Sequence, residues 1–496
     1  MIGHSEELML FHSIEKNKEQ HPEQAAFLFR ENREMRSVTH RAFFHQVCGC
    51  RRRFLASGFR RVGILGTNSY QWICNAFGLL AADITVAMLD PLLPEADLLS
   101  AIRRTDLEML LIDETLPELR RLIQVKIPEV ALSEFWQEPE NSSISENTQG
   151  WKEGEAIFFT SGTSQTSKAV VTPTTSIGGH AEAQKKLVSH CERDVILHPL
   201  PYHHSYGFAM LCLYHSMNCS IFISSMKSLL ADVKAVQPDR IVLVPSAVEF
   251  LHKKKALVYG PKSIMVSGSS FPRELAASVR ALGIAVQNQY GSSELPCGIG
   301  DNLPGDDVDV LTLHSFVKIE LVEDGEILVT DPYHFREYYK DPEATAATLQ
   351  DGKVHTGDMG YLDEQGRLHL FGRKKNMILM ENGEKVFCPD VDAELSQLPS
   401  VEAAAVIYVN GHLIAVVSPK MSATEADILQ SVAAYNSRQP YYRRMWKTWI
   451  YPGSLPYTSS GKLHRSRLER EYSESLSHIG DTEKNNQVVA ETSGAS

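Results

Sequence analysis

Long apolar runs are absent from this sequence of 496 residues. The apolar segment Ile73–Leu80 is far shorter than the roughly 20 residues that a membrane-spanning helix needs. The first residues after Met1 lack the basic and then apolar pattern of a secretory leader. These absences argue against a membrane span and predict a cytoplasmic protein.

Cysteines are few, and they are not spaced as metal ligands or as a disulfide framework. The chain has 8 of them, and Cys48 and Cys50 form the only close pair. Nothing elsewhere in the sequence complements that pair with the spacing of a zinc site. We therefore expect free thiols, as is usual for proteins in a reducing compartment.

Positive charge is also in deficit. The 49 lysines and arginines are outnumbered by 61 aspartates and glutamates, which gives a formal net charge of -12. This balance argues against nucleic acid or an anionic membrane as the main partner, since both attract basic surfaces. The remaining composition, 43% hydrophobic and 22% charged, is that of an ordinary globular protein. A chain of this length exceeds what one core usually serves, so we expect two or more domains.

Short apolar segments of strand length alternate with longer segments of helical spacing through most of the chain. The expected strands are Arg61–Gly66, Ile84–Leu89, Met109–Asp113, Ala156–Phe159, Asp194–Leu200, Cys219–Ser224, Arg240–Pro245, Ser263–Gly268 and Ala285–Asn288. The expected helices are Ser37–Leu55, Asn68–Ala82, Pro91–Arg103 and Pro272–Leu282. This alternation predicts an α/β fold in which parallel sheets are covered by helices.

The pattern changes from Phe316 onward. Val317–Val322 and Glu326–Thr330 flank a Glu-Asp-Gly turn, and this arrangement predicts a β-hairpin. Tyr361–Leu362 and Arg367–Phe371 flank a second polar turn in the same way. The closing segment is polar and poor in apolar residues, so we expect it to be disordered.

The strand expected at Ala156–Phe159 runs into a loop rich in hydroxyl side chains. The candidate phosphate-binding residues of this loop are Thr160, Ser161, Gly162, Thr163, Ser164 and the closing Lys168. Hydroxyls and backbone N–H groups at a turn, with a lysine beside them, suit the oxygens of a polyphosphate. The spacing is not that of the Walker loop. Taken alone, a loop rich in serine and threonine is more often an ordinary solvated turn, so support has to come from elsewhere in the chain.

Three further polar loops begin where expected strands end. They are Pro199–Gly207, Ser267–Ser270 and Gln289–Glu294. In open α/β sheets, ligands bind at the carboxyl ends of the strands, where such loops meet. We therefore expect these loops and the hydroxyl-rich loop to share one cleft.

Five stretches in this order resemble the AMP-forming adenylating superfamily, which includes acyl- and aryl-CoA ligases, peptide-synthetase adenylation domains and firefly luciferase. The stretches are Thr160–Lys168, Asn288–Glu294, Asp351–Asp358, Phe371–Asn376 and Pro456–Arg465. They are similar to the family's phosphate loop, its Tyr-Gly-x-Thr-Glu stretch, its ribose site, its hinge and its closing lysine loop. Each is a weak signal alone, but all five in family order identify the chain as a member.

The resemblance implies a large N-terminal domain of helices layered on parallel or mixed sheets, with a β-barrel-like subdomain, and a small mobile α+β C-terminal domain. We place the large domain at residues 1–373, the small domain at residues 374–472 and a disordered polar tail at residues 473–496. Lys375 matches the family's pivot, about which the small domain would rotate between two half-reactions.

The resemblance also implies a reaction that uses ATP, Mg²⁺ and CoA. A carboxylate attacks the α-phosphorus of ATP, pyrophosphate leaves, and the acyl-adenylate then passes its acyl group to a thiol. Charge on the transferring and leaving oxygens has to be neutralised in such a step. Glu294, with Thr163, is the implied metal ligand, because magnesium takes hard oxygen ligands.

Other residues are implied to bind the nucleotide or the thiol. Asp358 would accept hydrogen bonds from the ribose hydroxyls, with Arg373 assisting, and Tyr290 would offer a ring to the adenine or lie in the core. The full set is Thr160, Ser161, Gly162, Thr163, Ser164, Lys168, Gly268, Ser269, Ser270, Asn288, Gln289, Tyr290, Gly291, Ser292, Ser293, Asp358, Arg373, Lys375, Gly383 and Lys385.

Two residues are implied to be catalytic. Lys462 of the closing loop would meet the carboxylate oxygen and the α-phosphate, and His204 would border the carboxylate pocket. Read alone, a histidine in an apolar loop is more often a satisfied core residue. Relatives that activate α-amino acids carry an aspartate in the loop that here spans residues 202–207, and this chain has none there. An aryl acid or a short or medium acyl acid is therefore the expected substrate.

Two alternatives stay open. Transfer to the thiol of a free acyl carrier protein competes with transfer to CoA, since Gly383–Lys385 resembles both kinds of ligase. The phosphate loop also departs from the family at Gln165, Ser167 and Ala169, where glycine or proline is usual. A glutamine at a position of positive φ costs on the order of 1 kcal/mol. The second alternative is thus an adenylate-binding scaffold with little turnover.

Overall fold

The computed structural model describes residues 9–32, 34–116, 127–135, 148, 151–160, 167–185, 192–296, 298–303, 305–380, 383–457 and 463–476. The described residues form two compact units. The first contains those within Met1–Thr160, Thr166–Thr356 and Gly360–Leu370, and the second contains Gly357–Met359 and those within Phe371–Ser496. Within the described ranges, none of the helices has the length and apolar character needed to cross a membrane.

The shorter of two large sheets follows the order β18-β8-β7-β4-β3-β5-β6. Its strands are β3 Arg61–Leu65, β4 Thr85–Leu89, β5 Met109–Ile112, β6 Glu129–Ala131, β7 Glu155–Phe159, β8 Ala169–Pro173 and β18 Glu337–Tyr338. The strands from β3 to β7 pair in parallel, whereas β8 pairs antiparallel with both β7 and β18. The parallel strands therefore all end at one edge of the sheet, where the hydroxyl-rich segment connects β7 to β8.

The longer sheet follows the order β16-β17-β20-β21-β15-β14-β13-β12-β11-β9-β10-β1-β2, with β19 on β20. Its strands are β1 Ala25–Glu31, β2 Glu34–Thr39, β9 Val195–His198, β10 Ser220–Ile223, β11 Arg240–Leu243, β12 Ser263–Val266, β13 Ala285–Tyr290, β14 Gly300–Asp301, β15 Val310–Leu313, β16 Lys318–Leu321, β17 Glu326–Thr330, β19 Leu349–Gln350, β20 Lys353–Leu362 and β21 Leu368–Arg373. Pairing is parallel from β1 through β10, β9, β11 and β12 to β13. Antiparallel pairs continue the path beyond β13, in the region that we expected to be barrel-like.

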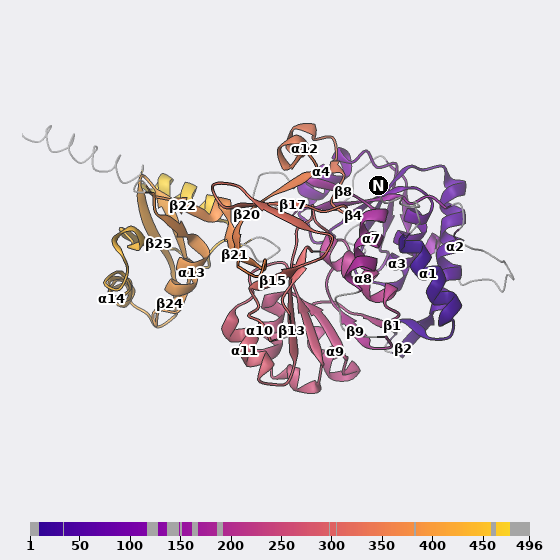
Figure 1. Cartoon of the computed structure of the whole chain (residues 1–496), viewed down its shortest axis with the longest axis horizontal. Coiled ribbons are helices and arrows are strands. Elements are labelled where there is room, and N and C mark those ends of the chain that lie inside the picture. Colours follow the sequence, from indigo (N-terminus) through magenta and orange to yellow (C-terminus); the bar gives the residue numbers. More distant parts are fainter. Residues whose placement is uncertain are drawn as a thin grey trace, which may run out of the picture. The chain divides into compact units, whose positions relative to one another are not determined.

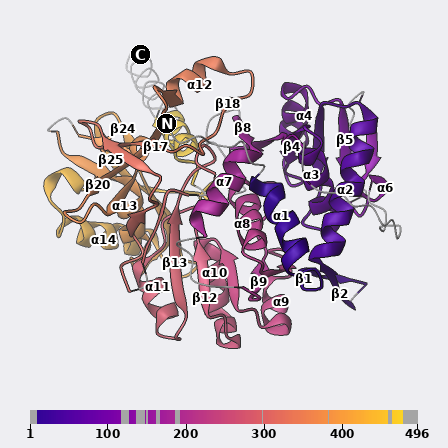
Figure 2. The ribbon, with the colours of Figure 1, turned by 45° about the vertical axis from the view of Figure 1, so that its right-hand side comes forward.

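Helices connect and cover the strands of the first unit. The α-helices are α1 Met9–Gln20, α2 His40–Ser57, α3 Tyr70–Ala81, α4 Glu95–Arg104, α6 Leu132–Phe135, α7 Thr174–Gln184, α8 Ser205–Ser216, α9 Leu229–Val236, α10 Pro245–Lys253, α11 Arg273–Arg280 and α12 Pro342–Thr348, and η1 Ala256–Tyr259 is a 3-10 helix. Figures 1 and 2 show α9, α10 and α11 beside the strands β9 to β13. Side chains of these three helices share a hydrophobic cluster with those strands.

The two sheets contribute to one shared hydrophobic core. Ile196 of β9 and Val86 of β4 lie in it, together with side chains of α1, α2, α3, α7 and α8. The next residues, Leu197 and Ala87, belong instead to separate clusters with α9–α11 and with α4. This alternation is expected of strands that are buried on both faces. The first unit is therefore built from layers of helices and sheets, and its loops at the strand ends are available for a site.

The second unit has a hairpin, a small sheet and three α-helical segments among its described residues. Its elements are η2 Lys374–Asn376, β22 Met377–Leu379, β23 Lys385–Phe387, α13 Cys388–Ser396, β24 Val401–Val409, β25 His412–Pro419, α14 Glu425–Asn436, η3 Tyr441–Arg443 and β26 Lys447–Ile450. A further helical stretch covers residues 465–476. β24 pairs antiparallel and β26 parallel with β25, and α13 and α14 pack on the sheet through a core of their own.

The α/β fold predicted from the sequence is confirmed. The strands expected between Arg61 and Asn288 are all present with small shifts of their ends, and so are both expected hairpins, β16–β17 and β20–β21. The helix expected to begin at Ser37 begins at His40, because Thr39 ends β2 and caps α2 by accepting a hydrogen bond from the N–H of Ala42. The predicted domain boundaries and the predicted disorder of the tail stay predictions.

Candidate active site

The carboxyl ends of the parallel strands in the two large sheets meet at one place. Asp90 directly follows β4, and His203 lies in the turn after β9. Their side chains approach each other, and His203 Nε2 lies 3.4 Å from Asp90 Oδ1. β7 pairs in parallel with β4, so Thr160 after β7 emerges at the same edge as Asp90. The ends of β4, β7 and β9 therefore lie at this edge within the first unit.

The described ends of the phosphate loop are fastened to each other. The N–H of Thr160 donates to the carbonyl of Lys168 over 3.0 Å, and the N–H of Lys168 donates to Thr160 Oγ1 over 3.0 Å. Arg104 of α4 donates to the carbonyl of Ser167 over 2.9 Å. These contacts extend the β7–β8 pairing to the two ends of the loop. The other predicted loop residues, Ser161, Gly162, Thr163 and Ser164, lie outside the described residues.

A single tyrosine connects the lysine of this loop to the predicted metal ligand. Lys168 Nζ lies 4.2 Å from the centre of the Tyr338 ring, which places the ammonium over the aromatic face. The hydroxyl of Tyr338 donates to Glu294 Oε1 over 2.6 Å. Tyr338 is buried and is held in β18, which pairs with β8. The structure thus brings Lys168 and Glu294 to the same side chain, although they are far apart in the sequence.

Glu294 has the properties that a ligand of a hard cation needs. Its backbone carbonyl accepts a hydrogen bond of 2.8 Å from the N–H of Phe335, so its position is fixed from two sides. Its carboxylate is half-buried, and it lies near the lysine that suits phosphate oxygens. Magnesium is usually bound by one or two carboxylates together with phosphate oxygens and water. The residues present therefore fit a magnesium ion carried by a polyphosphate.

Backbone packing fixes the loop that carries Glu294. A Cβ on Gly291 would lie 2.7 Å from the Cα and 2.9 Å from the nitrogen of Gly298, so only glycine fits. The N–H of Ile299 donates to the carbonyl of Tyr290 over 2.7 Å and closes the same turn. Ser292 and Ser293 follow Gly291, and both are half-buried.

Asn288 and Gln289 precede this loop in β13. The backbone N–H of Asn288 donates to the side chain of Asn302, and its side-chain amide donates to the carbonyl of Val308 over 2.6 Å. Gln289 is only 3% exposed, and neither polar atom of its side chain has a hydrogen-bond partner among the described residues. A buried amide without a partner is costly to the folded state.

Gly268, Ser269 and Ser270 follow β12, the parallel neighbour of β13. The register pairs Val266 with Asn288, so the two strand ends lie side by side. Gly268 has a φ of 96°, and a Cβ there would meet only Val244, at 3.6 Å. Ser269 and Ser270 are exposed. The predicted nucleotide-binding residues of these two loops therefore come together at one edge of the sheet.

His204 lies in the turn between β9 and α8. Its N–H donates to the carbonyl of Pro201 over 3.2 Å, and its own carbonyl accepts from the N–H of Phe208 over 2.9 Å at the start of the helix. Its ring centre is 4.6 Å from that of His203. Burial lowers the pKa of His203 well below its usual range, and the charge of His204 acts in the same direction. The predicted catalytic histidine is thus held at the same sheet edge as Asp90.

Three predicted residues lie together in the second unit. Arg373 Nε lies 2.8 Å from Asp358 Oδ1, and the carboxylate of Asp358 is buried. Partial burial lowers the pKa of Lys375, the charge of Arg373 lowers it further, and Asp358 opposes both. The backbone of Gly357 before Asp358 has a φ of 66°. A carboxylate oriented by an arginine is suited to accepting hydrogen bonds from vicinal hydroxyls.

The remaining predicted residues are spread through the second unit. Gly383 and Lys385 lie at the tip and in β23 of the β22–β23 hairpin, where Gly383 has a φ of 83°. Its N–H donates to the carbonyl of Met380 over 2.9 Å. Lys385 is exposed. Lys462, the predicted catalytic lysine, lies outside the described residues.

Tyr338 was not predicted as a site residue, although it forms the contact that joins Lys168 to Glu294. The sequence does carry a local signal beside it, since Asp341 and Pro342 mark the start of α12. That signal predicts a turn after Tyr338, but it does not predict which carboxylate accepts a hydrogen bond from the Tyr338 hydroxyl.

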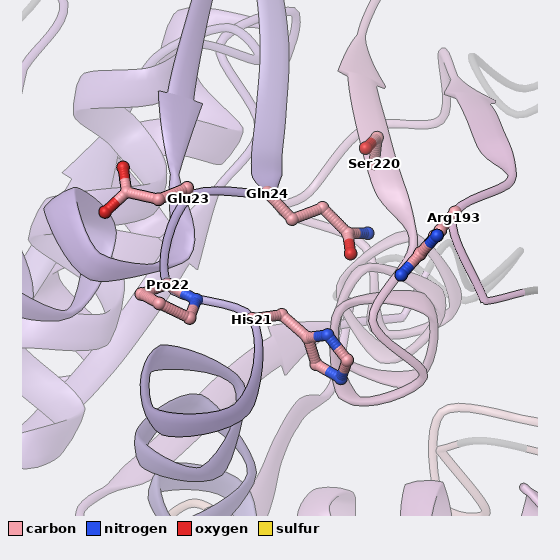
Figure 3. Close-up of a pocket in the computed structure, with 6 residues that line it drawn as sticks. All are labelled: His21, Pro22, Glu23, Gln24, Arg193 and Ser220. Carbon is pink, nitrogen blue, oxygen red and sulfur yellow. The ribbon is translucent and has the colours of Figure 1, made fainter.

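A separate hollow lies at the opposite ends of the strands. It is lined by His21, Pro22, Glu23, Gln24, Arg193 and Ser220 (Figure 3). These residues precede or begin the parallel strands β1, β9 and β10. Ligands of open α/β sheets collect at the carboxyl ends of strands, so this hollow is not the candidate site.

Comparison with known proteins gives a family match that covers most of the chain. The sequence profile of the AMP-binding enzyme family matches residues 14–339. The feruloyl-CoA synthase of an Amycolatopsis species is 27% identical over 307 residues, which cover 57% of this chain and 62% of that protein. The medium-chain fatty-acid–CoA ligase of Escherichia coli is 25% identical over 396 residues, which cover 72% of this chain and 68% of that protein. The aligned part thus spans about three fifths of the length of the feruloyl-CoA synthase.

Solved structures share the fold over nearly their whole length. The amide bond synthetase of Marinactinospora thermotolerans aligns with a TM-score of 0.78 at 21% identity, covering 93% of this chain and 99% of that chain. The o-succinylbenzoate CoA synthetase of Bacillus subtilis, solved with an acyl-adenylate intermediate, aligns with a TM-score of 0.77 at 20% identity, covering 92% and 97%. At these identities the likeness establishes the fold alone.

Proposed function

The chain belongs to the AMP-binding enzyme family, and we propose that it is an ATP-dependent ligase that activates a carboxylic acid. In this proposal the acid forms an acyl-adenylate with release of pyrophosphate, and the acyl group then passes to the thiol of CoA. The observation that carries the proposal is the connection of Lys168 through Tyr338 to Glu294, beside the loop at the end of β7.

The phosphate-binding step uses charge that is already in place. We assign the β- and γ-phosphates to the loop Thr160–Lys168, where Lys168 supplies positive charge to their oxygens. Glu294, with Thr163, would hold the Mg²⁺ ion that accompanies the phosphates and neutralises charge on them. Tyr338 orients the Glu294 carboxylate through its 2.6 Å hydrogen bond. Preorganised groups of this kind need no reordering as charge develops in the transition state.

Binding of the nucleoside is assigned to three sets of residues. The carboxylate of Asp358, oriented by Arg373 over 2.8 Å, would accept hydrogen bonds from the ribose hydroxyls. The adenine would lie against Tyr290 and the loop Gly268–Ser270, where Gly268 leaves room for its edge. Gln289, the third member of the assignment, directly precedes Tyr290 in β13.

The acid substrate is proposed to be an aryl acid or a short or medium acyl acid. His204 would face its carboxylate, and Lys462 would meet the attacking oxygen and the α-phosphate. The relatives support this class by name, since one is a feruloyl-CoA synthase and another a medium-chain fatty-acid–CoA ligase. The same names favour CoA over a carrier protein as the acceptor.

A hinge at Lys375 would allow one reaction centre to serve two half-reactions. We propose a large domain up to Arg373 and a small domain from residue 374 that rotates between them. Proline at position 375 fixes φ at about -65°, so Lys375→Pro restricts one of the two orientations of the small domain. We expect thiol transfer to slow more than adenylate formation. Equal slowing of both steps, with an unchanged thermal melt, would remove Lys375 from the role of pivot.

A panel of carboxylic acids tests the proposed function. Pyrophosphate release is measured with ATP and Mg²⁺ for each acid, first without and then with CoA. We expect release that depends on an acid and rises in the presence of CoA, because the thiol removes the adenylate. Release that no acid stimulates would refute the proposal. Stimulation by an acid but not by CoA would instead assign the acceptor to another thiol, such as that of a carrier protein.

A further inference from the structure

Asp90, His203 and His204 place three metal-binding side chains within reach of one another. Each offers one ligand atom, and these atoms all lie within 4.8 Å of one another. Asp90 comes from the end of β4 and the two histidines from the turn after β9. No role in nucleotide binding has been assigned to Asp90 or His203. The group is therefore distinct in its chemistry from Glu294, which offers oxygen alone.

Asp90 is held in position by local backbone contacts. Its Oδ1 accepts a hydrogen bond of 2.8 Å from the N–H of Leu92, and its carbonyl accepts one of 3.3 Å from the N–H of Leu93. These two bonds fold the chain into a tight turn between β4 and α4. His203 Nε2 approaches the same oxygen at 3.4 Å, so the carboxylate already faces the histidines.

The histidine turn is equally constrained. The side chain of Asn68 accepts from the N–H of Tyr202 over 3.0 Å and donates to the carbonyls of Leu200 and Ser224 over 2.8 Å and 3.1 Å. The N–H of His204 donates to the carbonyl of Pro201 within the same turn. His203 is only 8% exposed, which limits the directions its ring can take. The backbone of this turn is already ordered, so binding a ligand here costs little conformational entropy, and this favours affinity.

We propose that Asp90, His203 and His204 bind a divalent transition-metal cation of the Zn²⁺ or Co²⁺ type. Two imidazoles and one carboxylate are a ligand set typical of such ions, at metal–nitrogen distances of about 2.0–2.1 Å. Ligand atoms around one such ion lie about 3–4 Å apart, so small side-chain rotations close the site. Three protein ligands leave a position open for water or a substrate oxygen. Mg²⁺ prefers all-oxygen sites and does not compete well for imidazole.

Occupancy of this site has a consequence that rests on the proposed function. His204 is the residue assigned to the acid's carboxylate, and a bound metal would engage its ring. We therefore expect Zn²⁺ to inhibit adenylate formation when Mg²⁺ is in excess. Binding of the metal does not itself depend on that reaction, so the two can be measured separately.

Cobalt titration of the full chain tests the binding directly. Co²⁺ is added to the metal-free protein, the visible absorption of the bound ion is followed, and Zn²⁺ is then added to displace it. We expect one Co²⁺ per chain and at least tenfold weaker binding in Asp90→Asn and in His203→Gln. The matched control is His252→Gln, a histidine of α10 outside the group, which should bind as the parent does. Equal binding by all of these proteins, or no saturable binding by the parent, would overturn the proposal.

A thermal melt keeps the test informative if a variant is less stable. Zn²⁺ should raise the melting temperature of the parent and of His252→Gln, because a ligand that binds only the folded state stabilises it. It should not raise that of Asp90→Asn or His203→Gln, whatever their starting values. A normal Zn²⁺-dependent rise in both variants would contradict the site.

Inhibition of pyrophosphate exchange by Zn²⁺ tests the functional consequence of the site. Pyrophosphate exchange is measured at fixed Mg²⁺ with increasing Zn²⁺, and each protein is compared with its own uninhibited rate. Asp90→Asn should need at least tenfold more Zn²⁺ for half inhibition than the parent. If Asp90→Asn and the parent are equally sensitive to Zn²⁺, the inhibition does not act through a metal bound beside His204. If no protein shows exchange, that result counts against the proposed function and leaves the cobalt result standing.

Discussion

At the residue scale, polar contacts orient the charged groups of the candidate site before any ligand binds. Glu294 is fixed by the hydroxyl of Tyr338 at 2.6 Å and by the N–H of Phe335 at 2.8 Å. The ring of the same tyrosine lies 4.2 Å from Lys168 Nζ. One aromatic side chain therefore holds a cation and an anion of the site, so less ordering is required when the nucleotide arrives.

The first prediction concerns the hydroxyl of Tyr338. Tyr338→Phe keeps the ring under Lys168 but removes the hydrogen bond to Glu294, and bonds to charged groups contribute about 1.5–3 kcal/mol. We expect pyrophosphate exchange to fall by about tenfold or more and to require more Mg²⁺ for half-maximal rate.

Tyr339→Phe is the matched control. Its hydroxyl donates to Asp106 over 3.0 Å, so this variant removes a similar bond to a carboxylate outside the site. Its exchange rate and Mg²⁺ dependence should equal those of the parent. If both variants behave alike, the contact between Tyr338 and Glu294 has no part in the reaction.

The sequence predicts residues of this site unevenly. Glu294 was predicted because it lies in a short motif whose order along the chain is informative. Tyr338 could not be predicted, since its partner is 44 positions away and depends on the pairing of β18 with β8. The Asp90–His203 pair was missed for the same reason, because it joins the ends of strands from two different sheets.

At the scale of elements, the turn from β9 into α8 determines where His203 and His204 lie. Gly207, in the first turn of α8, packs against the preceding turn so closely that a Cβ would lie 2.1 Å from the carbonyl oxygen of Pro201. Real contacts of this kind are not that short, so any side chain here would push the helix away from the turn. Glycine at this position is thus required by packing.

The second prediction follows from that contact. Gly207→Ala should lower the melting temperature and the exchange rate, because α8 has to move and His204 moves with it. Gly49→Ala in α2 is the control, since a Cβ at this position would have no atom within 4 Å and alanine favours helix by about 0.5–1 kcal/mol. Gly49→Ala should be slightly more stable than the parent. Two variants of equal stability would contradict the packing argument.

Strands were predictable where both faces are buried. β4 and β9 lie between two hydrophobic clusters, so their sequences are short apolar runs that stand out. β2 has the opposite character, because it is an edge strand with an exposed run that includes Met35, which is 53% exposed. No apolar pattern marks it, and its last residues were assigned to the helix that follows.

At the scale of the whole molecule, folding buries ionisable groups that water would otherwise solvate. Burial raises the pKa of Glu153 to about 7, while interactions with Thr174 and with the backbone of Phe11 and Leu10 act in the opposite direction. Between the ordinary pKa of a glutamate and about 7, the folded state therefore holds a proton that the unfolded state has released. The contribution of Glu153 to the free energy of unfolding therefore falls as the pH rises through that window.

The third prediction follows from this fall in stability with rising pH. Glu153→Gln replaces the carboxyl by a group that does not ionise, so the variant lacks the penalty that the parent acquires as the pH rises from the ordinary pKa of a glutamate to about 7. The melting temperature of the variant minus that of the parent should be more positive at pH 8 than at pH 5. Glu402→Gln, at an exposed position of β24, should show the same difference at both pH values. A difference for Glu153→Gln that does not change with pH would refute the assignment.

The central claim is that this chain joins a carboxylic acid to AMP, and isotope exchange between pyrophosphate and ATP measures that step most directly. With the best acid from the panel, we predict that label enters ATP only when acid and Mg²⁺ are both present, and that an acyl-adenylate mass is recovered from the protein. Lys462→Ala should lower the exchange by a factor on the order of 10², since a charge is removed from the transition state. Exchange that is independent of acid, or formation of ADP in place of AMP, would contradict the claim.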